Sequence, residues 1–487
     1  MGLEENIQRE LSSKKHELDS LQSIDLSFNI DGLPIFRSSN VALWPVQCVI
    51  ANIPDTKPFI VALYSGHHKP KNLDFLHDFV AELKKIMEQG IRIDNSPLIP
   101  VHLRCIICDA PAKAQVKGIV QYNGRFGCDY CDVQGEHKGT MLFLGVGEPR
   151  TDETFRSKKN PEHHKVDSPL LDLNVDIILN FPIDPMHCVD LGVTRRLLLL
   201  WKEGPVPLKL SAGQIAIISG YNQALAQFIP REFNRKPRRL DDLRMWKATE
   251  YHLFLMYIGP LVLKYVLPTE KYVHFLCLHV AIRILYSTKY VSTMKKHAHA
   301  LLKTFVDGMK TLYTERCITY NVHCLQHMAQ IAEVYGSLDQ CTAYPFENNM
   351  AKIKRIVRGP TKPLVQVARR LAEMNNTAIT PQAKNYTSEK PKVNDCYQLK
   401  NGKYCTIDAV QISEGRALCQ VYARSSSYFS KPFDSRKVGV VKVNKNDIDM
   451  QYCDFSELAG KAICIPLSVL DRNESMSAVI ISLVHSL

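Results

Sequence analysis

The stretch from Val322 to Arg358 constrains the fold of this chain more than any other part of the sequence. It contains His323 and His327, which are four residues apart, so both rings project from one face of a predicted helix. Far upstream, Cys128 and Cys131 form a Cys-x-x-Cys pair in a predicted loop. Two thiolates and two imidazoles are the ligand set of a closed structural zinc site, although each pair alone is more often coincidence. We therefore expect a Cys2His2 zinc site that joins two distant segments.

The composition is that of a globular protein with a positive charge. The chain has 487 residues, of which 45% are hydrophobic and 23% charged, and its net charge is +12. The length suggests about three domains, and the charge favours a polyanionic partner. The first residues lack the apolar core of a secretory signal, and the longest apolar stretch, from Leu253, is interrupted by Pro260 and Lys264. With 15 cysteines, an odd number, these features favour reduced thiols in the cytosol or nucleus and no membrane partner.

The first part of the chain alternates between strand and helix patterns. Asp31 ends the first predicted strand, which alternates apolar and polar residues as a half-buried strand does, and Asp109 follows the fourth, which is apolar on both sides. This is the order of an α/β ribonuclease-H-like catalytic core, although other α/β domains share it. Strands are predicted at residues 24–31, 42–53, 58–65 and 98–108, and helices at 73–90 and 110–122.

Helical patterns replace strands between residues 124 and 322, which predicts a large all-α insertion. A basic loop at 230–247 lies within it, and solvated surface and phosphate contact explain its charge equally well. Trp246 in this loop is most simply a packing residue, but it can also stack on an unpaired base. The helices are expected at 189–202, 211–228, 240–266, 270–286 and 294–313, and the DNA-binding candidates are Arg235, Lys236, Arg238 and Arg239.

A basic segment, a polar linker and a β-rich region complete the chain. Residues 352–370 contain seven Lys or Arg and no acid, and the DNA-binding candidates among them are Lys352, Lys354, Arg355 and Arg358. The last region shows short strands with turns, which predicts a small C-terminal β-rich, barrel-like domain. The expected segments are 1–23 (amino-terminal helix), 24–123 (core, first part), 124–322 (zinc knuckle and helical insertion), 323–380 (zinc-ligand helix and core, last part), 381–394 (linker) and 395–487 (β-rich domain).

Three acids are candidates for a shared metal site, and each also has a simpler explanation. Asp31 stands before a glycine, as in a hairpin turn, Asp109 can cap the helix that follows it, and Glu347 begins a basic helix. Together, two acids at the ends of strands and one from a helix match what phosphodiester cleavage with two Mg²⁺ ions requires. His187, in the motif DPMH, is equally well explained as a core or capping residue.

Several blocks of the sequence, taken together, resemble one family of enzymes. They are CDAPA at Asp109, FGCDYC at Cys128 and Cys131, DPMHCVDLG at His187, and NVHCLQHM followed by AYPFENNMAKIKR at Glu347. These blocks resemble the cut-and-paste DDE transposases of the CACTA/EnSpm type. They are also similar, at comparable relative offsets, to the catalytic core of the V(D)J recombinase and its Transib relatives. The resemblance covers residues 24–375.

The resemblance implies a ribonuclease-H-like fold with a helical insertion, the zinc site described above, and a metal-binding triad of Asp31, Asp109 and Glu347. It also implies that His187 lies near the active site and that Trp246 helps to hold distorted DNA. The cofactors would be Mg²⁺ (or Mn²⁺) and structural Zn²⁺. The partners would be double-stranded DNA, both transposon ends and target DNA, bound by a homodimer or higher oligomer in the nucleus.

Two other functions compete with DNA cleavage and strand transfer. A domesticated, transposon-derived chain can keep the fold and the zinc, bind DNA or chromatin, and no longer cut. The lack of a recognisable end-recognition module ahead of Asp31 favours that alternative, whereas retention of all three acids favours an intact site. A metal-dependent nuclease acting on RNA is the third candidate, because such a triad contacts phosphates and not sugars.

Overall fold

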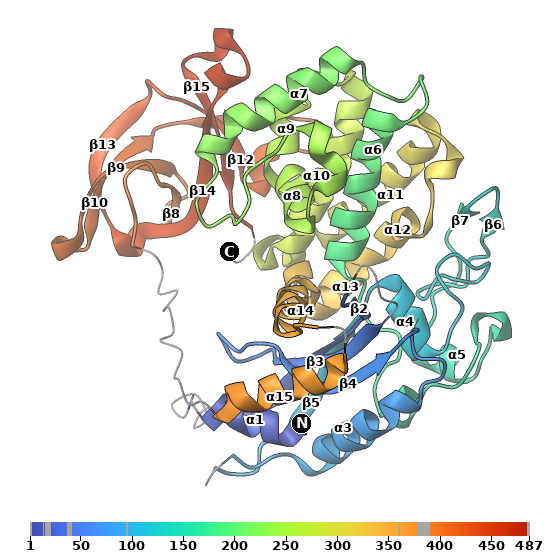
Figure 1. Cartoon of the computed structure of the whole chain (residues 1–487). Coiled ribbons are helices and arrows are strands. Elements are labelled where there is room, and N and C mark those ends of the chain that lie inside the picture. Colours follow the sequence, from blue (N-terminus) through green and yellow to red (C-terminus); the bar gives the residue numbers. More distant parts are fainter. Residues whose placement is uncertain are drawn as a thin grey trace. The chain divides into compact units, whose positions relative to one another are not determined.

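The chain forms two compact units, each assembled from segments that are far apart in the sequence (Figure 1). The computed structural model describes residues 2–12, 14, 21–36, 41–93, 96–359, 361–376 and 390–484, so most of the predicted linker and part of the predicted amino-terminal segment lie outside the described residues. The first unit contains Met1–His187, Ile318–His327 and Gln340–Thr380, and the second contains Cys188–Cys317, Met328–Asp339 and Pro381–Leu487.

A five-stranded sheet forms the centre of the first unit. Strand β3 pairs antiparallel with β1, β2 and β4, whereas β5 pairs parallel with β1. The carboxyl ends of β1 and β5 are therefore neighbours. The four strands predicted from the sequence are present, each within three residues of its expected ends. The strands are β1 (Ile24–Ile30), β2 (Leu33–Pro34), β3 (Ala42–Ile50), β4 (Phe59–Gly66) and β5 (Val101–Ile107).

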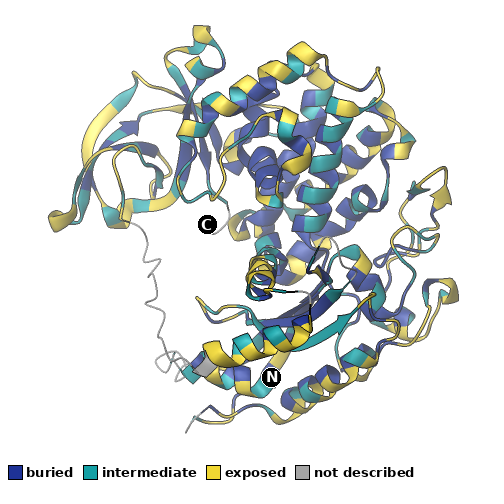
Figure 2. Cartoon of the chain, in the orientation of Figure 1, coloured by how far each residue is buried: buried dark blue, intermediate teal, exposed yellow. Residues whose placement is uncertain are grey.

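Helices cover both faces of this sheet. On one face lies α3 (His77–Gln89), where the rings of Phe79 and Phe28 of β1 are 5.0 Å apart. On the other face, α14 (Tyr344–Ile356) and α15 (Pro363–Asn376) share one apolar cluster with side chains of β2, β3 and β4. A further helix, α1 (Leu3–Ser12), contacts α3 and β4. The sheet is thus a middle layer, in which β1, β3 and β5 are mostly buried and β4 is mostly half-buried (Figure 2).

The environment of β1 differs from the prediction. Its alternating pattern predicts one solvated face, yet Ser27 and Asn29 are buried. Asn29 donates a hydrogen bond to the carbonyl of Ile107 (2.9 Å) and accepts one from the amide of Gln47 (3.0 Å), which is itself fully buried. The polar side chains form hydrogen bonds within the core instead of facing water, so the expectation of a half-buried strand is wrong.

The same buried amides hold α14 on the sheet. Gln47 accepts a hydrogen bond from Asn349 at 2.9 Å, and its own amide lies 3.5 Å from the carbonyl oxygen of Phe346. Both partners belong to the first turns of α14, next to Glu347. Because buried polar groups are costly when unpaired, this network fixes the position of α14 more tightly than apolar packing alone.

The helix after β5, α4 (Ala110–Lys117), is shorter than the predicted span of 110–122. It ends because Gly118 adopts a left-handed backbone with φ +67°. A Cβ atom at this position would lie 2.2 Å from the carbonyl oxygen of Val166, so only glycine fits there. The chain then enters the loop that carries Cys128 and Cys131.

The second unit begins with helices. The single helix predicted at 240–266 is divided, because the backbone is extended at Trp246 and a π-helical segment, Phe254–Ile258, interrupts the remainder. Another π-helical segment, Met186–Thr194, leads into the first helix. The helices are α6 (Arg195–Glu203), α7 (Ala212–Leu225), α8 (Ala248–Leu253), α9 (Gly259–Val262), α10 (Thr269–Tyr286), α11 (Thr288–Leu312) and α13 (Met328–Tyr335).

An eight-stranded antiparallel sheet completes the second unit. Its order is β11-β12-β15-β14-β8-β9-β10-β13, which leaves β11 and β13 as the edges. The strands are β8 (Cys396–Leu399), β9 (Tyr404–Gln411), β10 (Arg416–Tyr422), β11 (Ser425–Ser427), β12 (Val440–Asn444), β13 (Ile448–Asp454), β14 (Leu458–Pro466) and β15 (Ser477–Ser482).

Arg283 of α10, which is fully buried, connects these helices to the sheet. Its guanidinium donates hydrogen bonds to the carbonyl oxygens of Val438 (3.0 and 2.9 Å), Ser482 (2.8 Å) and Met256 (3.1 Å). Val438 lies two residues before β12, and Ser482 is the last residue of β15. The β-rich region, which the sequence suggests is a separate domain, is therefore part of the same unit as the helices.

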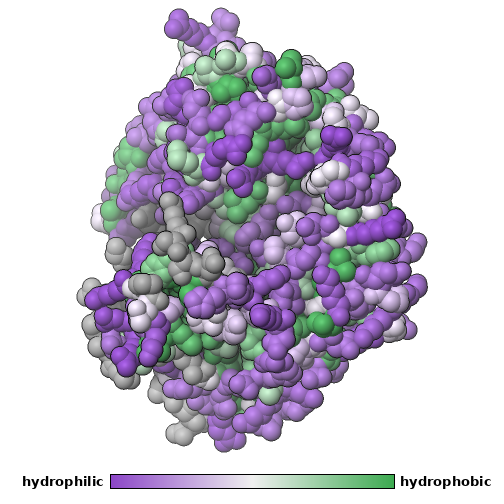
Figure 3. All heavy atoms as spheres, turned by 45° about the vertical axis from the view of Figure 1, so that its right-hand side comes forward, coloured by the Kyte–Doolittle hydropathy of each residue, from purple (hydrophilic) through white to green (hydrophobic). Residues whose placement is uncertain are grey.

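On the face drawn in Figure 3, hydrophilic residues predominate and apolar side chains appear in small separate groups. Within the ranges that the structure describes, none of the helices combines the length and apolar character needed to cross a bilayer.

We expect Arg283→Ala to lower the local stability of the second unit by about 3 kcal/mol, because it leaves buried carbonyl oxygens without donors. Hydrogen–deuterium exchange of peptides from β12 and β15 measures this loss as faster exchange. Arg416→Ala, which removes a half-exposed guanidinium, is the matched control and should change exchange little. Equal protection in both variants would contradict the role of Arg283.

Candidate functional site

Four metal-ligating side chains converge in the first unit, as predicted. Cys128 and Cys131 lie in the loop after α4, His323 in α12 (Tyr320–Cys324) and His327 at the end of the turn Leu325–His327. All four are buried, and their ligand atoms lie within 4.8 Å of one another. The chain therefore contains a buried Cys2His2 cluster that is compatible with structural zinc.

The distances within this cluster match a tetrahedron around one ion. With Zn–S near 2.3 Å and Zn–N near 2.0 Å, the expected separations are about 3.8 Å for S–S, about 3.5 Å for S–N and about 3.3 Å for N–N. The two sulfurs are 3.6 Å apart and the two Nε2 atoms 3.3 Å apart. The sulfur–nitrogen distances that accompany them are 3.2, 3.4 and 3.7 Å. The residues present thus fit zinc.

Packing orients the ring of His323. Its second ring nitrogen, Nδ1, is buried and has no hydrogen-bond partner within the described part of the chain. The ring instead lies 5.5 Å from that of Phe143 and 5.1 Å from that of His327, between centroids. The loop segment around Phe143 is held in turn by a backbone hydrogen bond to the carbonyl of Ile318 (3.0 Å).

Two buried lysines of α4 connect the zinc cluster to Asp109. Lys117 forms an ion pair with Asp129, which stands between the two cysteines, at 2.5 Å. Lys113 donates to the hydroxyl of Tyr130 at 2.7 Å. Asp109 is the N-cap of the same helix, since its carboxylate accepts a hydrogen bond from Ala112 N at 2.7 Å. The knuckle and the acid at the end of β5 are therefore tied to one short, buried helix.

Two of the three acids predicted to share a metal, Asp31 and Asp109, lie in one group with His187, and Glu347 lies beside His187. Ligand atoms of Asp31, Asp109 and His187 are within 4.8 Å of one another, and His187 Nε2 is 4.0 Å from Glu347 Oε1. The simpler explanation holds for Asp109, whose Oδ1 caps α4. It does not hold for Asp31, because β1 and β2 on either side of it each pair with β3 and form no hairpin, and Asp31 Oδ1 accepts a hydrogen bond from Gly32 N at 2.6 Å. Each of these hydrogen bonds uses Oδ1, so both are compatible with a second role for the same carboxylate.

Burial and neighbouring charges shift the pKa values of the residues in this cluster. Burial, with the charges of Asp109 and Glu347, raises the pKa of Asp31 to about 7. Burial also raises the pKa of Asp109 and of Glu347. Burial alone would lower the pKa of His187, but the hydrogen bond and charge of Asp184, with the charge of Asp31, raise it to about 9. Gathered, partly desolvated carboxylates of this kind could hold a divalent ion.

Asp184 is a site residue that the sequence reasoning missed. Its carboxylate lies 2.5 Å from His187 Nδ1 and accepts hydrogen bonds from Met186 N (3.1 Å) and Ala343 N (2.9 Å). Ala343 directly precedes α14, the helix of Glu347. The detectable signal is the spacing Asp-x-x-His, which places an acid within reach of the histidine. Asp184 therefore joins the segment of His187 to the start of the helix that carries Glu347.

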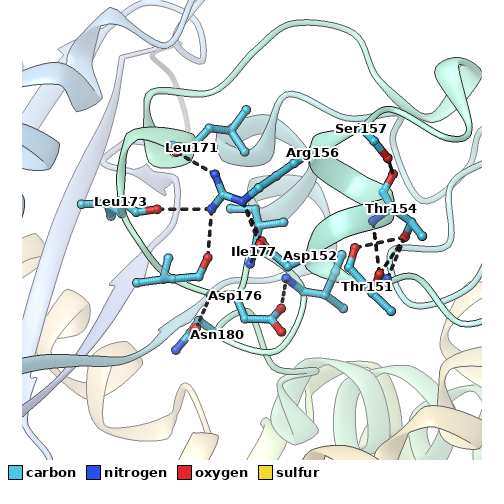
Figure 4. Close-up of polar contacts among 12 residues, drawn as sticks. Thr151, Asp152, Thr154, Arg156, Ser157, Leu171, Leu173, Asp176, Ile177 and Asn180 are labelled. Carbon is cyan, nitrogen blue, oxygen red and sulfur yellow. Dashed lines mark hydrogen bonds and ion pairs between the residues drawn. The ribbon is translucent and has the colours of Figure 1, made fainter.

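A polar anchor holds the segment that leads to Asp184 (Figure 4). Arg156, at the end of α5 (Asp152–Arg156), donates to Asp152 and to the carbonyls of Leu171 (2.8 Å) and Leu173 (3.2 Å). Further along, Asn180 donates to the carbonyl of residue 104 at 2.8 Å, and its own carbonyl accepts from residue 106 at 2.7 Å. The segment therefore runs beside β5, which brings residues 184 and 187 to the end of that strand.

The predicted basic loop of the second unit offers less free charge than its sequence suggests. Arg238 pairs with the buried Glu250 at 2.5 Å, and Arg239 with Asp241 at 2.8 Å. The amine of Lys236 contacts the carbonyl oxygen of residue 230 at 3.1 Å, and Arg235 is exposed.

Trp246 is in the interior of the second unit. Only 6% of it is exposed, and its indole N–H donates to the carbonyl oxygen of Arg239 at 3.2 Å. Its ring packs against those of Tyr251 and Phe254. The structure thus supports the simpler explanation, packing, and does not support stacking on DNA.

The basic residues after Glu347 are on the surface of the first unit. Lys352, Lys354, Arg355 and Arg358 are all exposed, and Lys354 donates to the carbonyl oxygen of Pro34 at 2.9 Å. Cys105 and Cys108, by contrast, are buried thiols, as expected of core residues.

We expect the purified protein to contain about one zinc per chain, and Cys128→Ser or His323→Ala to lower that content at least about tenfold, because a three-ligand site loses the closed tetrahedron. Mass spectrometry of the bound metal measures the content. Cys105→Ala, which removes a buried thiol elsewhere in the same unit, should keep its zinc. Full zinc content in Cys128→Ser would sink the assignment.

Comparison with known proteins adds one finding. A domain of unknown function, DUF8592, matches residues 365–483, which include all eight strands of the second unit's sheet. No curated protein matches the chain.

Proposed function

We propose that this chain is a transposase-derived DNA-processing protein, whose first unit is a ribonuclease-H-like catalytic core that cleaves DNA and transfers strands. One observation carries the proposal: carboxylates from three separate elements, Asp31 after β1, Asp109 after β5 and Glu347 in α14, gather around His187. A helix cap explains Asp109 singly, but it does not explain why the three acids meet.

The sheet of the first unit supports the proposed fold. Strands β4, β3, β1 and β5 follow one another across the sheet, with only the last pair parallel. This is the order expected from three antiparallel strands followed by a crossover helix and a parallel strand. On the side of β5 that faces away from β1, the segment around Asn180 forms hydrogen bonds with β5, where a further strand could otherwise pair.

Each site residue has a defined part in this proposal. Asp31 and Asp109 would hold the metal ions from the ends of adjacent strands, and Glu347 would complete the site from α14. Bound Mg²⁺ or Mn²⁺ supplies activation of water and stabilisation of the leaving oxygen. His187, fixed by Asp184, presents Nε2 to the same space. The 3′ hydroxyl released by cleavage would then attack a second phosphodiester in strand transfer.

Double-stranded DNA is the proposed partner, in a nuclear protein that acts as a dimer or larger oligomer. The exposed cations of α14 begin at Lys352, five residues after Glu347, so a phosphate backbone bound there would pass close to the acids. The competing function is a silent DNA- or chromatin-binding protein with the same fold, and a test of cleavage separates the two.

We expect the protein to nick supercoiled plasmid in the presence of Mg²⁺ or Mn²⁺, and Asp109→Asn to reduce the rate on the order of 10³-fold while zinc content and folding stay unchanged. Glu347→Gln should behave likewise. Asp78→Asn, a change in an exposed acid of α3, is the control and should nick normally.

Equal nicking by the parent and Asp109→Asn would show that the acids are not catalytic. No nicking by the parent, together with retained DNA binding, would support the silent alternative.

We also expect the double variant Lys352→Ala, Arg355→Ala to weaken binding to double-stranded DNA uniformly across sequences. The slope of log affinity against log salt should fall by about 2, one for each lost phosphate contact. Fluorescence anisotropy at several salt concentrations measures this slope. Lys84→Ala, Lys85→Ala removes the same charge from exposed positions of α3, and an identical loss there would contradict a specific DNA path along α14.

A further inference from the structure

We propose that His187 is itself a ligand, through Nε2, of the divalent cation held by Asp31 and Asp109, and that this makes the site prefer Mn²⁺ to Mg²⁺. This inference rests on the proposed function, since it concerns the same site. It adds a nitrogen donor that the three-acid description of the site lacks.

The first argument is the commitment of the two ring nitrogens. His187 Nδ1 lies 2.5 Å from Asp184 Oδ2, so that nitrogen carries the proton that is shared with the carboxylate. The remaining nitrogen, Nε2, faces the acids, 4.0 Å from Glu347 Oε1. A cation bound there would replace any proton on Nε2, as it does generally at histidine ligands.

The second argument is the distance between the donor atoms. Atoms of His187, Asp31 and Asp109 lie within 4.8 Å of one another and come from three different elements. Three atoms no more than 4.8 Å apart always have a central point that is within about 2.8 Å of each of them. A cation at that point needs shifts of less than 1 Å to reach ordinary metal–ligand distances from all three.

The third argument is the support behind the ring. Asp184 is buried, and its two oxygens accept hydrogen bonds from the backbone N–H groups of Met186 (3.1 Å), His187 (3.2 Å) and Ala343 (2.9 Å). The hydroxyl of Thr342 lies 3.4 Å away. A carboxylate fixed in this way behind an imidazole is the usual outer shell of a metal-ligating histidine, where it sets the ring orientation and the tautomer.

The ligand set decides the class of metal. Mg²⁺ prefers oxygen ligands and keeps much of its water, whereas imidazole suits first-row transition ions. One imidazole with carboxylates is therefore better matched to Mn²⁺. Asp184 acts through His187 and is a positioning residue in this scheme.

The test uses the full-length, zinc-loaded protein with Mn²⁺ as the probe. Electron spin echo spectroscopy detects a directly bound nitrogen through its ¹⁴N coupling, and isothermal titration with Mn²⁺ and Mg²⁺ gives the ratio of affinities. Unchanged zinc content shows that Mn²⁺ has not entered the Cys2His2 cluster. Circular dichroism checks the fold of each variant.

We expect ¹⁴N coupling in the parent protein and its loss in His187→Ala, with Mn²⁺ affinity falling at least about tenfold and Mg²⁺ affinity falling less. Asp184→Asn should keep the coupling but weaken Mn²⁺ binding about 10–100-fold. His102→Ala, at an exposed position of β5, is the control and should match the parent.

Mn²⁺ binding that depends on Asp31 and Asp109 but shows no ¹⁴N coupling would overturn this inference and leave the proposed function standing. Absence of any Mn²⁺ or Mg²⁺ binding that depends on those acids would overturn both.

Discussion

The convergence of Cys128, Cys131, His323 and His327 is the constraint on which the first unit depends. Cys128 and His323 are 195 residues apart in sequence, yet their ligand atoms lie 3.2 Å apart. Four donors buried at tetrahedral separations are costly to keep together without an ion, because each would lose hydration without a partner. A bound zinc reverses that cost and makes the return of the chain to the first unit favourable.

Buried polar contacts extend this constraint to the acids. Lys117 and Lys113 tie the zinc knuckle to α4, whose N-cap is Asp109. Asp184 joins His187 to the start of α14, and Gln47 holds the same helix from β3. The geometry of the site therefore depends on charges and amides inside the unit, which lose stability if one partner is removed.

Local patterns in the sequence predict the elements of the first unit well, because alternation, caps and breaks act over a few residues. The zinc ligands were predictable too, since Cys-x-x-Cys and an i, i+4 histidine pair each restrict the chemistry. These local patterns could not predict which polar side chains are buried. Asn29 was expected on the solvated face of its strand, and its burial depends on partners in other strands, Gln47 and Ile107.

The same limit explains the misses in the site and in the second unit. Asp184 in DPMH gives a usable signal, but its bond to Ala343 spans 159 residues. The sequence of the basic loop is compatible with a phosphate-binding surface, but it does not reveal that Arg238 forms an ion pair with Glu250. Trp246 is a packing residue, as the simpler interpretation of the sequence predicted, because tryptophan side chains are usually buried to a large extent.

The interleaved arrangement of the two units has a consequence for how the chain folds during synthesis. Residues up to 187 make most of the first unit, but the helices of the second unit must be translated before His323, His327 and α14 exist. At ribosomal rates, the 195 residues from Cys128 to His323 take about 10–40 s. During that interval the nascent sheet lacks α14 and α15, which later cover one of its faces, and Cys128 and Cys131 lack their histidine partners.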